Sequence, residues 1–498
     1  MASKIFTGDI PELLEIIFNY LNNEIYSLYS CALVNRHWCK VSIPILWQDP
    51  FSLELRPFFI SNYFSSLDED EKFILKKCGI NMEISKTLFD YARFLKVLDL
   101  SSLENKVRKW FNYQHVRLRP NYAQSLYRIN NLLLKLFIKI GATLHKFSLH
   151  FLEIKPEIFY SIEQNDQFFS QLQNLSLSGI SGFNATTLLS ILAKNATKMN
   201  ALILDGFYPD YDESQLLHAL ICVIKSQVHL RTFGIVCERY ITKFHGIISA
   251  LESQKNSLQE IIIENCVFST EFEILKNFEN IKILRIRYCD PKLLKILNYK
   301  IVTLEIVDMQ IDATTTIQIL ENSGLLLNRL KLESSGKRIR EESLILESLN
   351  SFCPNITYLN ILNVEFSTQL VELIGNLQKL QFLTLWCNDG MPEEELSMRV
   401  IQFAKILPLT LQYLDLSDNW LNSHIDIFLN YCNAPLKKLL IYYLNNEKIT
   451  KALIEFRIRS GALKYVGVYR YVDLDDKIRK DVEAYFTLVP YDYIVVDC

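Results

Sequence analysis

Glycine, proline and long apolar runs are all scarce in this sequence. Only 14 Gly and 13 Pro occur among 498 residues, which argues against long disordered linkers. No stretch of about 18 uncharged apolar residues occurs, so no membrane-spanning helix is expected. The most apolar segment, residues 130–141, is interrupted by Lys135 and Lys139. The formal net charge of -3 gives no reason to expect a nucleic acid or a membrane surface as a partner.

Zinc-ligand spacing is absent from the 11 cysteines. There is no C-x-x-C pair, and Cys31, His37 and Cys39 lie close together in sequence without a fourth ligand. The first residues also lack the apolar segment of a secretion signal. We therefore expect no metal or other cofactor. We expect reduced, mostly buried thiols in a protein of the cytoplasm, the nucleus or both.

Motifs for phosphate binding and nucleophilic catalysis are missing too. Gly336 and Lys337 stand alone without the rest of a P-loop, and there is no G-x-G-x-x-G, no H-E-x-x-H and no nucleophile elbow. Asp475 and Asp476 are adjacent acids of the kind usually found solvated on a surface. The sequence therefore predicts a protein without an active site of its own.

What the chain has in abundance is one repeated segment, apolar-x-x-apolar-x-apolar. Alternating apolar residues predict a short strand with one buried side, and the intervening sequences have helical spacing. The fourteen segments are LKVLDL from Leu95, LHKFSL from Leu144, LQNLSL from Leu172, MNALIL from Met199, LRTFGI from Leu230, LQEIII from Leu258, IKILRI from Ile281, IVTLEI from Ile301, LNRLKL from Leu327, ITYLNI from Ile356, LQFLTL from Leu380, LQYLDL from Leu411, LKKLLI from Leu436 and LKYVGV from Leu463.

This pattern resembles that of the leucine-rich-repeat family. From Leu144 to Leu463 the spacing averages about 27 residues, within the family's period of roughly 20–29. Some repeats also carry the Asn or Cys that the family favours after two further residues, namely Cys266, Cys289, Asn388 and Asn419. The resemblance implies an α/β solenoid over residues 95–470, with a curved parallel sheet inside and helices outside.

The segments on either side of the repeats are expected to differ from them. Residues 51–94 contain no clear repeat and are expected to form a helical transition segment. Residues 471–498 are expected to form a helix and a strand that cap the last repeat. The long interval between the segments at Leu95 and Leu144 leaves open whether an irregular repeat or an insertion lies there.

The N-terminal stretch DIPELLEIIFNYL, residues 9–21, contains more apolar residues than one buried helix face needs. Asp9 and Glu12 have the spacing of a capping box, and Pro11 fits a first turn. Two further helices are predicted, one over residues 24–34 and one from Asn35 to Pro44. Three short helices cannot bury all of this apolar surface, so the surplus face is expected to contact another protein.

The N-terminal residues resemble an F-box. The resemblance rests on Ile10-Pro11-x-Leu13-Leu14-x-x-Ile17, then Leu28 and Cys31, then Val34-Asn35-Arg36-x-Trp38, and finally Leu46-Trp47. Ile10 departs from the Leu that is more usual at its position. F-box proteins dock on the adaptor subunit of an SCF-type ubiquitin ligase. The resemblance therefore implies that residues 1–50 bind this adaptor, and through it a cullin, while the repeats hold a substrate protein.

The resemblance also implies roles for individual residues. Val34, Trp38 and Trp47 would hold the three helices together. Ubiquitin transfer would belong to other subunits, so this chain would be a non-catalytic member of the complex. The residues implied to face the adaptor are Ile10, Pro11, Leu13, Leu14, Ile17, Leu21 and Leu28.

The substrate surface is predicted from the strand residues that point away from the buried side. In the last five repeats seven of these positions are aromatic, whereas the first nine repeats have none. Aromatic residues exposed on a rigid sheet are typical binding anchors. The alternative is strand propensity, or cover by the C-terminal cap, which we favour for Tyr465 and Tyr469. Predicted substrate contacts are Tyr358, Leu362, Phe382, Trp386, Tyr413 and Tyr442.

Mixed charges occupy the same face in the middle repeats, from Glu260 to Glu333. Because neighbouring repeats alternate in sign, pairing across strands is the expected explanation. A polar segment of a substrate could contact the same row of side chains.

Three other classes of protein compete with the ubiquitin-ligase receptor. One is a repeat scaffold whose F-box-like helices recruit no ligase. Another is a secreted recognition receptor, which predicts disulfides and glycosylated Asn residues. The third is an enzyme with an unfamiliar site, which requires a pocket with converging polar groups. The substrate itself cannot be named from the sequence.

Overall fold

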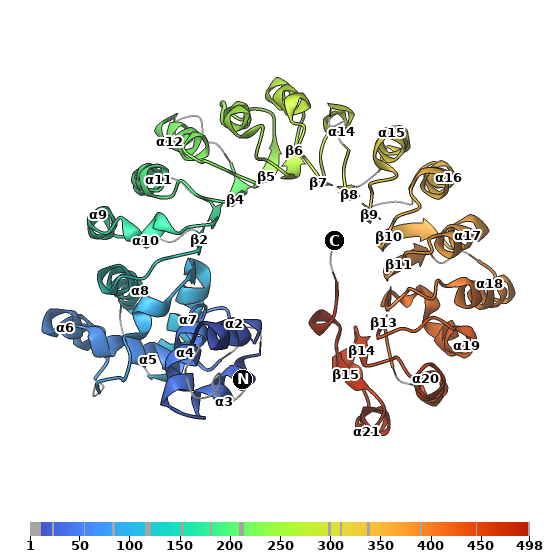
Figure 1. Cartoon of the computed structure of the whole chain (residues 1–498), viewed down its shortest axis with the longest axis horizontal. Coiled ribbons are helices and arrows are strands. Elements are labelled where there is room, and N and C mark those ends of the chain that lie inside the picture. The colour runs from blue at the N-terminus through green and yellow to red at the C-terminus, as the bar shows by residue number, and fades with distance from the viewer. Residues whose placement is uncertain are drawn as a thin grey trace. The chain divides into compact units, whose positions relative to one another are not determined.

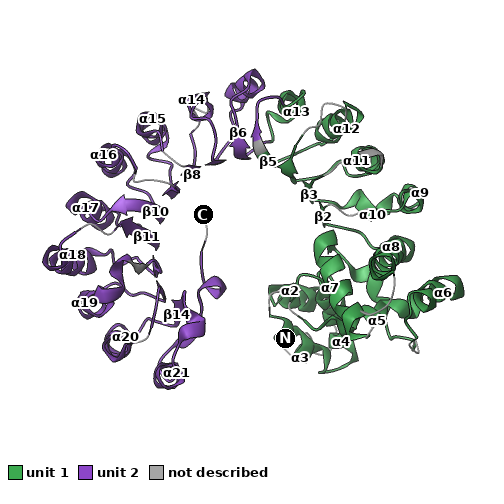
Figure 2. Ribbon diagram, turned by 180° about the vertical axis from the view of Figure 1, so that it is seen from behind, with its two compact units in different colours: residues 1–238, 244–257 green, residues 239–243, 258–498 purple. Residues whose placement is uncertain are grey.

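The structure is a computed structural model that describes residues 11–21, 24–53, 55–81, 85–114, 121–150, 154–179, 182–208, 214–296, 300–308, 311–335, 339–388, 391–444 and 446–496. It divides into two compact units, shown in Figure 2. Unit 1 comprises Met1–Glu238 and Phe244–Ser257, and unit 2 comprises Arg239–Lys243 and Leu258–Cys498. Within the described ranges no helix is both long enough and apolar enough to span a membrane.

Unit 1 begins with the three predicted short helices, α2 (Pro11–Tyr20), α3 (Ile25–Ala32) and α4 (Arg36–Leu46). The Asn35 side chain starts α4 by accepting a hydrogen bond from the Trp38 amide at 2.9 Å. The predicted end of this helix at Pro44 was wrong, because α4 continues to Leu46 with Pro44 inside it. The predicted capping residue Asp9 lies outside the described residues.

One apolar cluster holds these helices together. Its buried members are Leu14, Phe18, Leu28 and Ile45, and the Trp38 ring meets Phe18 edge-on with centroids 5.1 Å apart. Trp38 thus has the packing role that was predicted for it. Two neighbouring predictions were wrong. Val34 is exposed, and Trp47 stacks on Tyr91 at 4.0 Å, which attaches the helices to the next segment.

That next segment is helical, as predicted. It consists of η1 (Pro57–Phe59), α5 (Ile60–Tyr63), η2 (Phe64–Ser66), α6 (Glu69–Lys77) and η3 (Tyr91–Phe94). Asp68 and Glu71 form a complete capping box at the start of α6.

The repeats of unit 1 form parallel strands in chain order, with helices on one side of the sheet (Figure 1). Leu98, Phe147, Leu175, Leu202 and Phe233 stand in register on successive strands and are buried. The strands are β1 (Val97–Asp99), β2 (Lys146–His150), β3 (Asn174–Ser178), β4 (Ala201–Phe207) and β5 (Thr232–Ile241), of which the residues from Arg239 on belong to unit 2. The helices are α7 (Leu100–Tyr113), α8 (Tyr122–Ile140), α9 (Pro156–Gln164), α10 (Gln167–Ser170), α11 (Gly182–Asn195), α12 (Ser214–Lys225), α13 (Ile247–Ala250) and η4 (Leu251–Gln254).

Unit 2 continues the same design. Its strands are β6 (Glu260–Cys266), β7 (Ile283–Arg287), β8 (Thr303–Asp308), β9 (Arg329–Ser334), β10 (Tyr358–Glu365), β11 (Phe382–Asn388), β12 (Tyr413–Leu416), β13 (Lys438–Ile441), β14 (Tyr465–Val468) and β15 (Thr487–Pro490). Its helices are η5 (Thr270–Asn277), α14 (Lys292–Ile296), α15 (Ala313–Ser323), α16 (Glu342–Phe352), α17 (Thr368–Asn376), α18 (Glu393–Ile406), η6 (Asn419–His424), α19 (Ile425–Tyr431), α20 (Glu447–Ser460), η7 (Tyr471–Asp473), α21 (Asp476–Glu483) and η8 (Tyr491–Tyr493).

The predicted parallel α/β solenoid fold is confirmed, because each of the fourteen repeat segments overlaps one of the strands β1 to β14. Strands β6 to β15 pair in parallel within unit 2, and α21 followed by β15 supplies the predicted helix and strand of the cap. The interval from β1 to β2 holds the two helices α7 and α8, and its described residues include no further strand. We call the strand face that points away from the helices the inner face.

Candidate functional site

Helix α2 carries an apolar stripe that no part of the described chain covers. Leu13, Ile16, Ile17 and Tyr20 are all exposed, and Ile16 is 53% accessible. Their spacing of three, four and seven residues places them on one side of the helix. The buried residues Leu14 and Phe18 face the helix cluster instead. Helix α2 therefore has two apolar faces, of which the cluster uses only one.

Helix α3 adds a second exposed stripe. Tyr26, Tyr29 and Leu33 recur at helical spacing and are all exposed, whereas Leu28 is buried. Large apolar side chains left exposed along one side of a helix are typical of protein-binding surfaces. We call these seven residues, six on α2 and α3 and Leu33 directly after α3, the exposed helical face.

The structure separates the predicted adaptor-facing residues into two groups. Leu13 and Ile17 lie on the exposed helical face, whereas Leu14 and Leu28 are buried in the helix cluster. Leu21 is half-buried against that cluster. Ile10 lies outside the described residues, as does the Pro11 side chain. Their roles in adaptor binding stay predictions.

Sequence reasoning passed over Ile16, Tyr20, Tyr26, Tyr29 and Leu33 as candidates. Ile16 and Tyr20 have the same helical spacing as Leu13 and Ile17, so a phase analysis of α2 would have grouped all four. The tyrosines of α3 carry a polar hydroxyl on a large apolar ring, and such residues are typical interface anchors.

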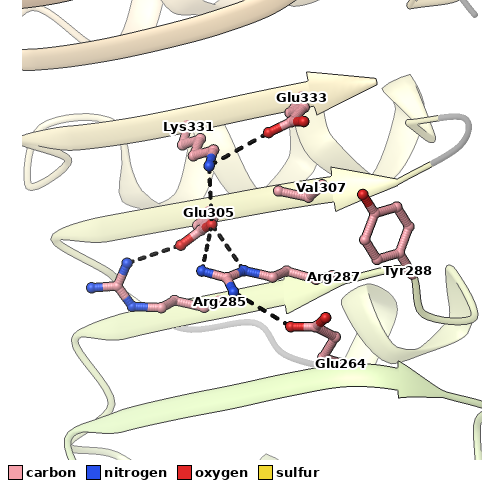
Figure 3. A pocket seen from close by; sticks show the side chains of 8 residues that line it. All are labelled: Glu264, Arg285, Arg287, Tyr288, Glu305, Val307, Lys331 and Glu333. Carbon is pink, nitrogen blue, oxygen red and sulfur yellow. Dashed lines mark hydrogen bonds and ion pairs between the residues drawn. The ribbon is translucent and has the colours of Figure 1, made fainter. Parts of the chain in front are cut away.

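A charged pocket of about 280 Å³ lies on the inner face of β6 to β9 (Figure 3). At its centre is Glu305, whose side chain is only 1% accessible. One Glu305 oxygen lies 2.9 Å from Arg285, and the other lies 2.9 Å from Arg287 and 3.6 Å from Lys331. The predicted pairing across strands is confirmed, because these cations come from β7 and β9 on either side of β8.

Three outer carboxylates pair with the same cations. Glu260 pairs with Arg285 at 3.0 Å, Glu264 with Arg287 at 3.4 Å, and Glu333 with Lys331 at 3.4 Å. Burial alone would raise the pKa of Glu305, but the hydrogen bond from Arg285 and the nearby charges of Arg287 and Lys331 outweigh it and lower this pKa. Glu305 is therefore ionised at neutral pH.

The predicted substrate residues lie on the inner face of β10 to β13. Tyr358, Leu362 and Tyr413 are buried, whereas Phe382, Trp386 and Tyr442 are half-buried. The Tyr442 ring stacks on Tyr469 with centroids 5.7 Å apart. Whether any of these residues contacts a substrate stays a prediction.

The chain's own C-terminal segment covers Tyr358 and Tyr413. Residues Tyr491–Val496, which we call the C-terminal tail, pack against Tyr413 and Leu440, with Ile494 buried between them. The expected cover of Tyr465 and Tyr469 is confirmed only in part: the Tyr469 ring meets Tyr491 of the tail edge-on with centroids 5.7 Å apart, but both side chains remain exposed. The tail that follows β15 lies instead against Tyr358, Tyr413 and Leu440 on the inner face of β10 to β13.

Beneath the tail lies a buried carboxylate. Asp415 accepts hydrogen bonds from the Tyr413 hydroxyl at 3.5 Å and the Tyr491 hydroxyl at 3.3 Å, and its other oxygen accepts the Ser417 amide at 2.9 Å. Burial raises the pKa of Asp415, and these hydrogen bonds limit the rise.

The described residues contain no group of three His, Cys, Asp or Glu side chains placed to hold a metal ion. Cys31, His37 and Cys39 belong to α3 and α4, and their side chains are half-buried. The ten cysteines that the structure describes are free thiols.

Comparison with known proteins identifies the N-terminal domain. Residues 11–52 match the family model described as F-box-like. No curated protein matches the chain. Similar solved structures include the yeast Rad7–Elc1 complex, at 14% identity over 79% of this chain and 98% of that one, with a TM-score of 0.44. A TLR13–ssRNA13 complex matches at 13% identity over 66% and 49%, with a TM-score of 0.36.

The leucine-rich-repeat protein LIC12759 of Leptospira interrogans is also similar, at 14% identity over 69% of this chain and 95% of that one, with a TM-score of 0.29. At such low TM-scores, these similarities do not bear on what this chain binds. The F-box-like match and the repeated strand-and-helix units of this structure together define its architecture. Residues 11–52 therefore form an F-box-like domain, and the strands and helices that follow form an α/β solenoid with the leucine-rich-repeat pattern.

Proposed function

We propose that this chain is the substrate-recognition subunit of an SCF-type ubiquitin ligase, in which the exposed helical face docks on the adaptor subunit. The observation that carries the proposal is the uncovered stripe Leu13, Ile16, Ile17 and Tyr20, which lies within the F-box-like residues 11–52. An amphipathic helix that offers such a stripe fits an apolar groove of a partner. Through the adaptor the chain would reach a cullin.

The repeats would supply the substrate-binding surface, while ubiquitin transfer would belong to other subunits. The inner face of unit 2 carries a charged pocket and the half-buried aromatic residues Phe382, Trp386 and Tyr442, which offer a protein substrate polar and apolar contacts. The proposal places the chain in the cytoplasm or nucleus, where thiols stay reduced.

The alternative is a repeat scaffold without ligase recruitment. The two proposals differ in whether the exposed helical face binds the adaptor. A plain cap on the first repeat needs one buried face on α2, and it does not explain the second apolar stripe that remains uncovered. We therefore favour the ligase subunit.

The test is adaptor binding by the full chain and by an Ile16→Asp, Ile17→Asp variant. Both side chains are exposed, so the change leaves the helix cluster intact. Two unpaired carboxylates would be buried at the interface, and we expect affinity to fall by at least about 100-fold. Co-purification and calorimetry measure this loss.

The matched control is Ile458→Asp on α20, an isoleucine that is 68% accessible in unit 2. It introduces one such carboxylate far from the F-box in sequence and should bind the adaptor like the natural chain. If the natural chain is folded but binds no adaptor, the scaffold is the correct function.

A further inference from the structure

We propose that the inner face of β10 to β14 is a groove for an extended apolar peptide, and that the C-terminal tail occupies this groove as an internal competitor. A substrate would then present a segment with the chemistry of the tail, a tyrosine followed after two residues by branched aliphatic residues, and would bind when the tail leaves. This inference rests on the proposed function for its biological meaning, but the groove itself can be tested without the adaptor.

The apolar part of the groove is shaped around Ile494. This side chain is buried with Tyr413 and Leu440, while Phe382 packs against the edge of the cluster. Gly467 leaves room for it, because a Cβ at that position would lie 3.1 Å from the Ile494 side chain. The absence of a side chain at Gly467 therefore leaves a recess in the sheet that a branched aliphatic residue fills.

The polar part of the groove recognises peptide backbone. The Val496 amide donates to the Tyr413 hydroxyl at 3.2 Å, and the Val496 carbonyl accepts from the Tyr358 hydroxyl at 3.0 Å. Tyr413 in turn donates to Asp415, which also accepts from Tyr491. Hydrogen bonds to a backbone amide and carbonyl do not depend on the side chain of that residue, so another peptide could form them.

Two buried polar atoms beside the groove lack partners among the described residues. They are Asn360 Oδ1, an acceptor, and Trp386 Nε1, a donor. Asn360 is 5% accessible and donates through its other amide atom to Tyr358, the residue that holds the tail. Buried groups of this kind cost roughly 1–3 kcal/mol each when unpaired. A substrate segment that extends past the tail's contacts could satisfy both.

The tail competes strongly because it is tethered. A segment attached to β15 experiences an effective concentration in the millimolar range, on the order of that for a short flexible linker. A free peptide at micromolar concentration would therefore be excluded from the natural chain, even if it binds the empty groove well.

The experiment measures binding of a fluorescein-labelled peptide with the sequence of residues 488–497, LVPYDYIVVD, to full-length variants. Ile494→Asp should release the tail because it would bury a charge against Tyr413 and Leu440. The matched control is Tyr493→Ala, a tail residue that is 72% accessible. We expect Ile494→Asp to bind the peptide at least tenfold more tightly than the natural chain or the control.

Two further arms locate the binding. Adding Tyr413→Phe to Ile494→Asp removes the acceptor of the Val496 amide and should weaken peptide binding about fivefold. A labelled peptide that carries the Ile494→Asp change should not bind. Should Ile494→Asp fold poorly by circular dichroism, Tyr491→Ala combined with Val496→Pro releases the tail by removing two of its hydrogen bonds and no buried aliphatic side chain.

The inference is overturned if folded, tail-released chains bind the peptide no better than the natural chain, which would make the tail a permanent cap. It is also overturned if the natural chain binds the peptide equally well, because the tail would then not compete. Neither result depends on adaptor binding. If the chain binds the adaptor but its tail-released variants bind no peptide, only the peptide groove is contradicted. If those variants bind the peptide but the chain binds no adaptor, only the proposed function is contradicted.

Discussion

Replacing Glu305 with Gln is expected to lower the free energy of unfolding by about 3 kcal/mol. The substitution removes the central anion from three cations and leaves Arg285 and Lys331 partly buried beside a neutral amide. The outer carboxylates still pair with the cations, and Arg287 is 37% accessible, so water compensates part of the loss. The effect should therefore fall at the lower end for a broken buried ion pair.

The matched control for this prediction is Glu264→Gln. Glu264 is 21% accessible and pairs with Arg287 at 3.4 Å, so its loss should cost less than about 1 kcal/mol. Urea unfolding at neutral pH measures both variants. Equal costs for the two substitutions would show that the buried centre of the pocket is no more important than its rim.

The natural chain and the Glu305→Gln variant should differ in how their stability depends on pH. Because the pKa of Glu305 is lower in the folded than in the unfolded chain, its ionisation stabilises the fold above its ordinary value of about 4.5. That contribution is lost as the pH falls through the lowered pKa of the folded state. The natural chain should therefore lose its stability advantage over Glu305→Gln in acid. A difference in the free energy of unfolding that stays constant with pH would show that the ionisation of Glu305 is not its cause.

Replacing Leu14 with Ala is expected to destabilise the F-box helices by about 3 kcal/mol, because it opens a cavity in a cluster with only four fully buried members. Leu13→Ala, one residue away and exposed, should change stability by less than about 0.5 kcal/mol. Limited trypsin digestion measures the difference, since Arg36 and Lys40 lie on α4.

Together these two leucine variants separate packing from contact. Leu14→Ala should lose adaptor binding together with protease resistance, whereas Leu13→Ala should weaken binding with resistance unchanged. If Leu14→Ala stayed resistant to trypsin while losing the adaptor, Leu14 would contact the adaptor directly, as the sequence-based prediction had it.

The solenoid could be predicted from the sequence because each repeat carries its own signal. Alternating apolar residues determine both the strand and its buried side, so the column from Ile261 through Leu284 and Leu304 follows from local pattern. The charge pairs around Glu305 could be predicted for the same reason, since parallel strands in register place neighbouring repeats side by side.

The candidate sites were less predictable because they depend on contacts between distant segments. Whether Leu13 or Leu14 is buried depends on how α3 and α4 dock on α2. The sequence of α2 alone does not determine this docking. The burial of Tyr358 depends on Val496, 138 residues away. The repeats give no sign of this contact, so Tyr358 and Tyr413 were expected to be accessible.

Amide hydrogen exchange of the full chain with and without the SCF adaptor subunit tests the central claim most directly. Docking of the exposed helical face should slow exchange in α2 and α3 at saturating adaptor, while β10 to β14 exchange as before. Stable binding with no protection of α2 or α3 would place the interface elsewhere. A folded chain that shows no protection and no binding would contradict the account.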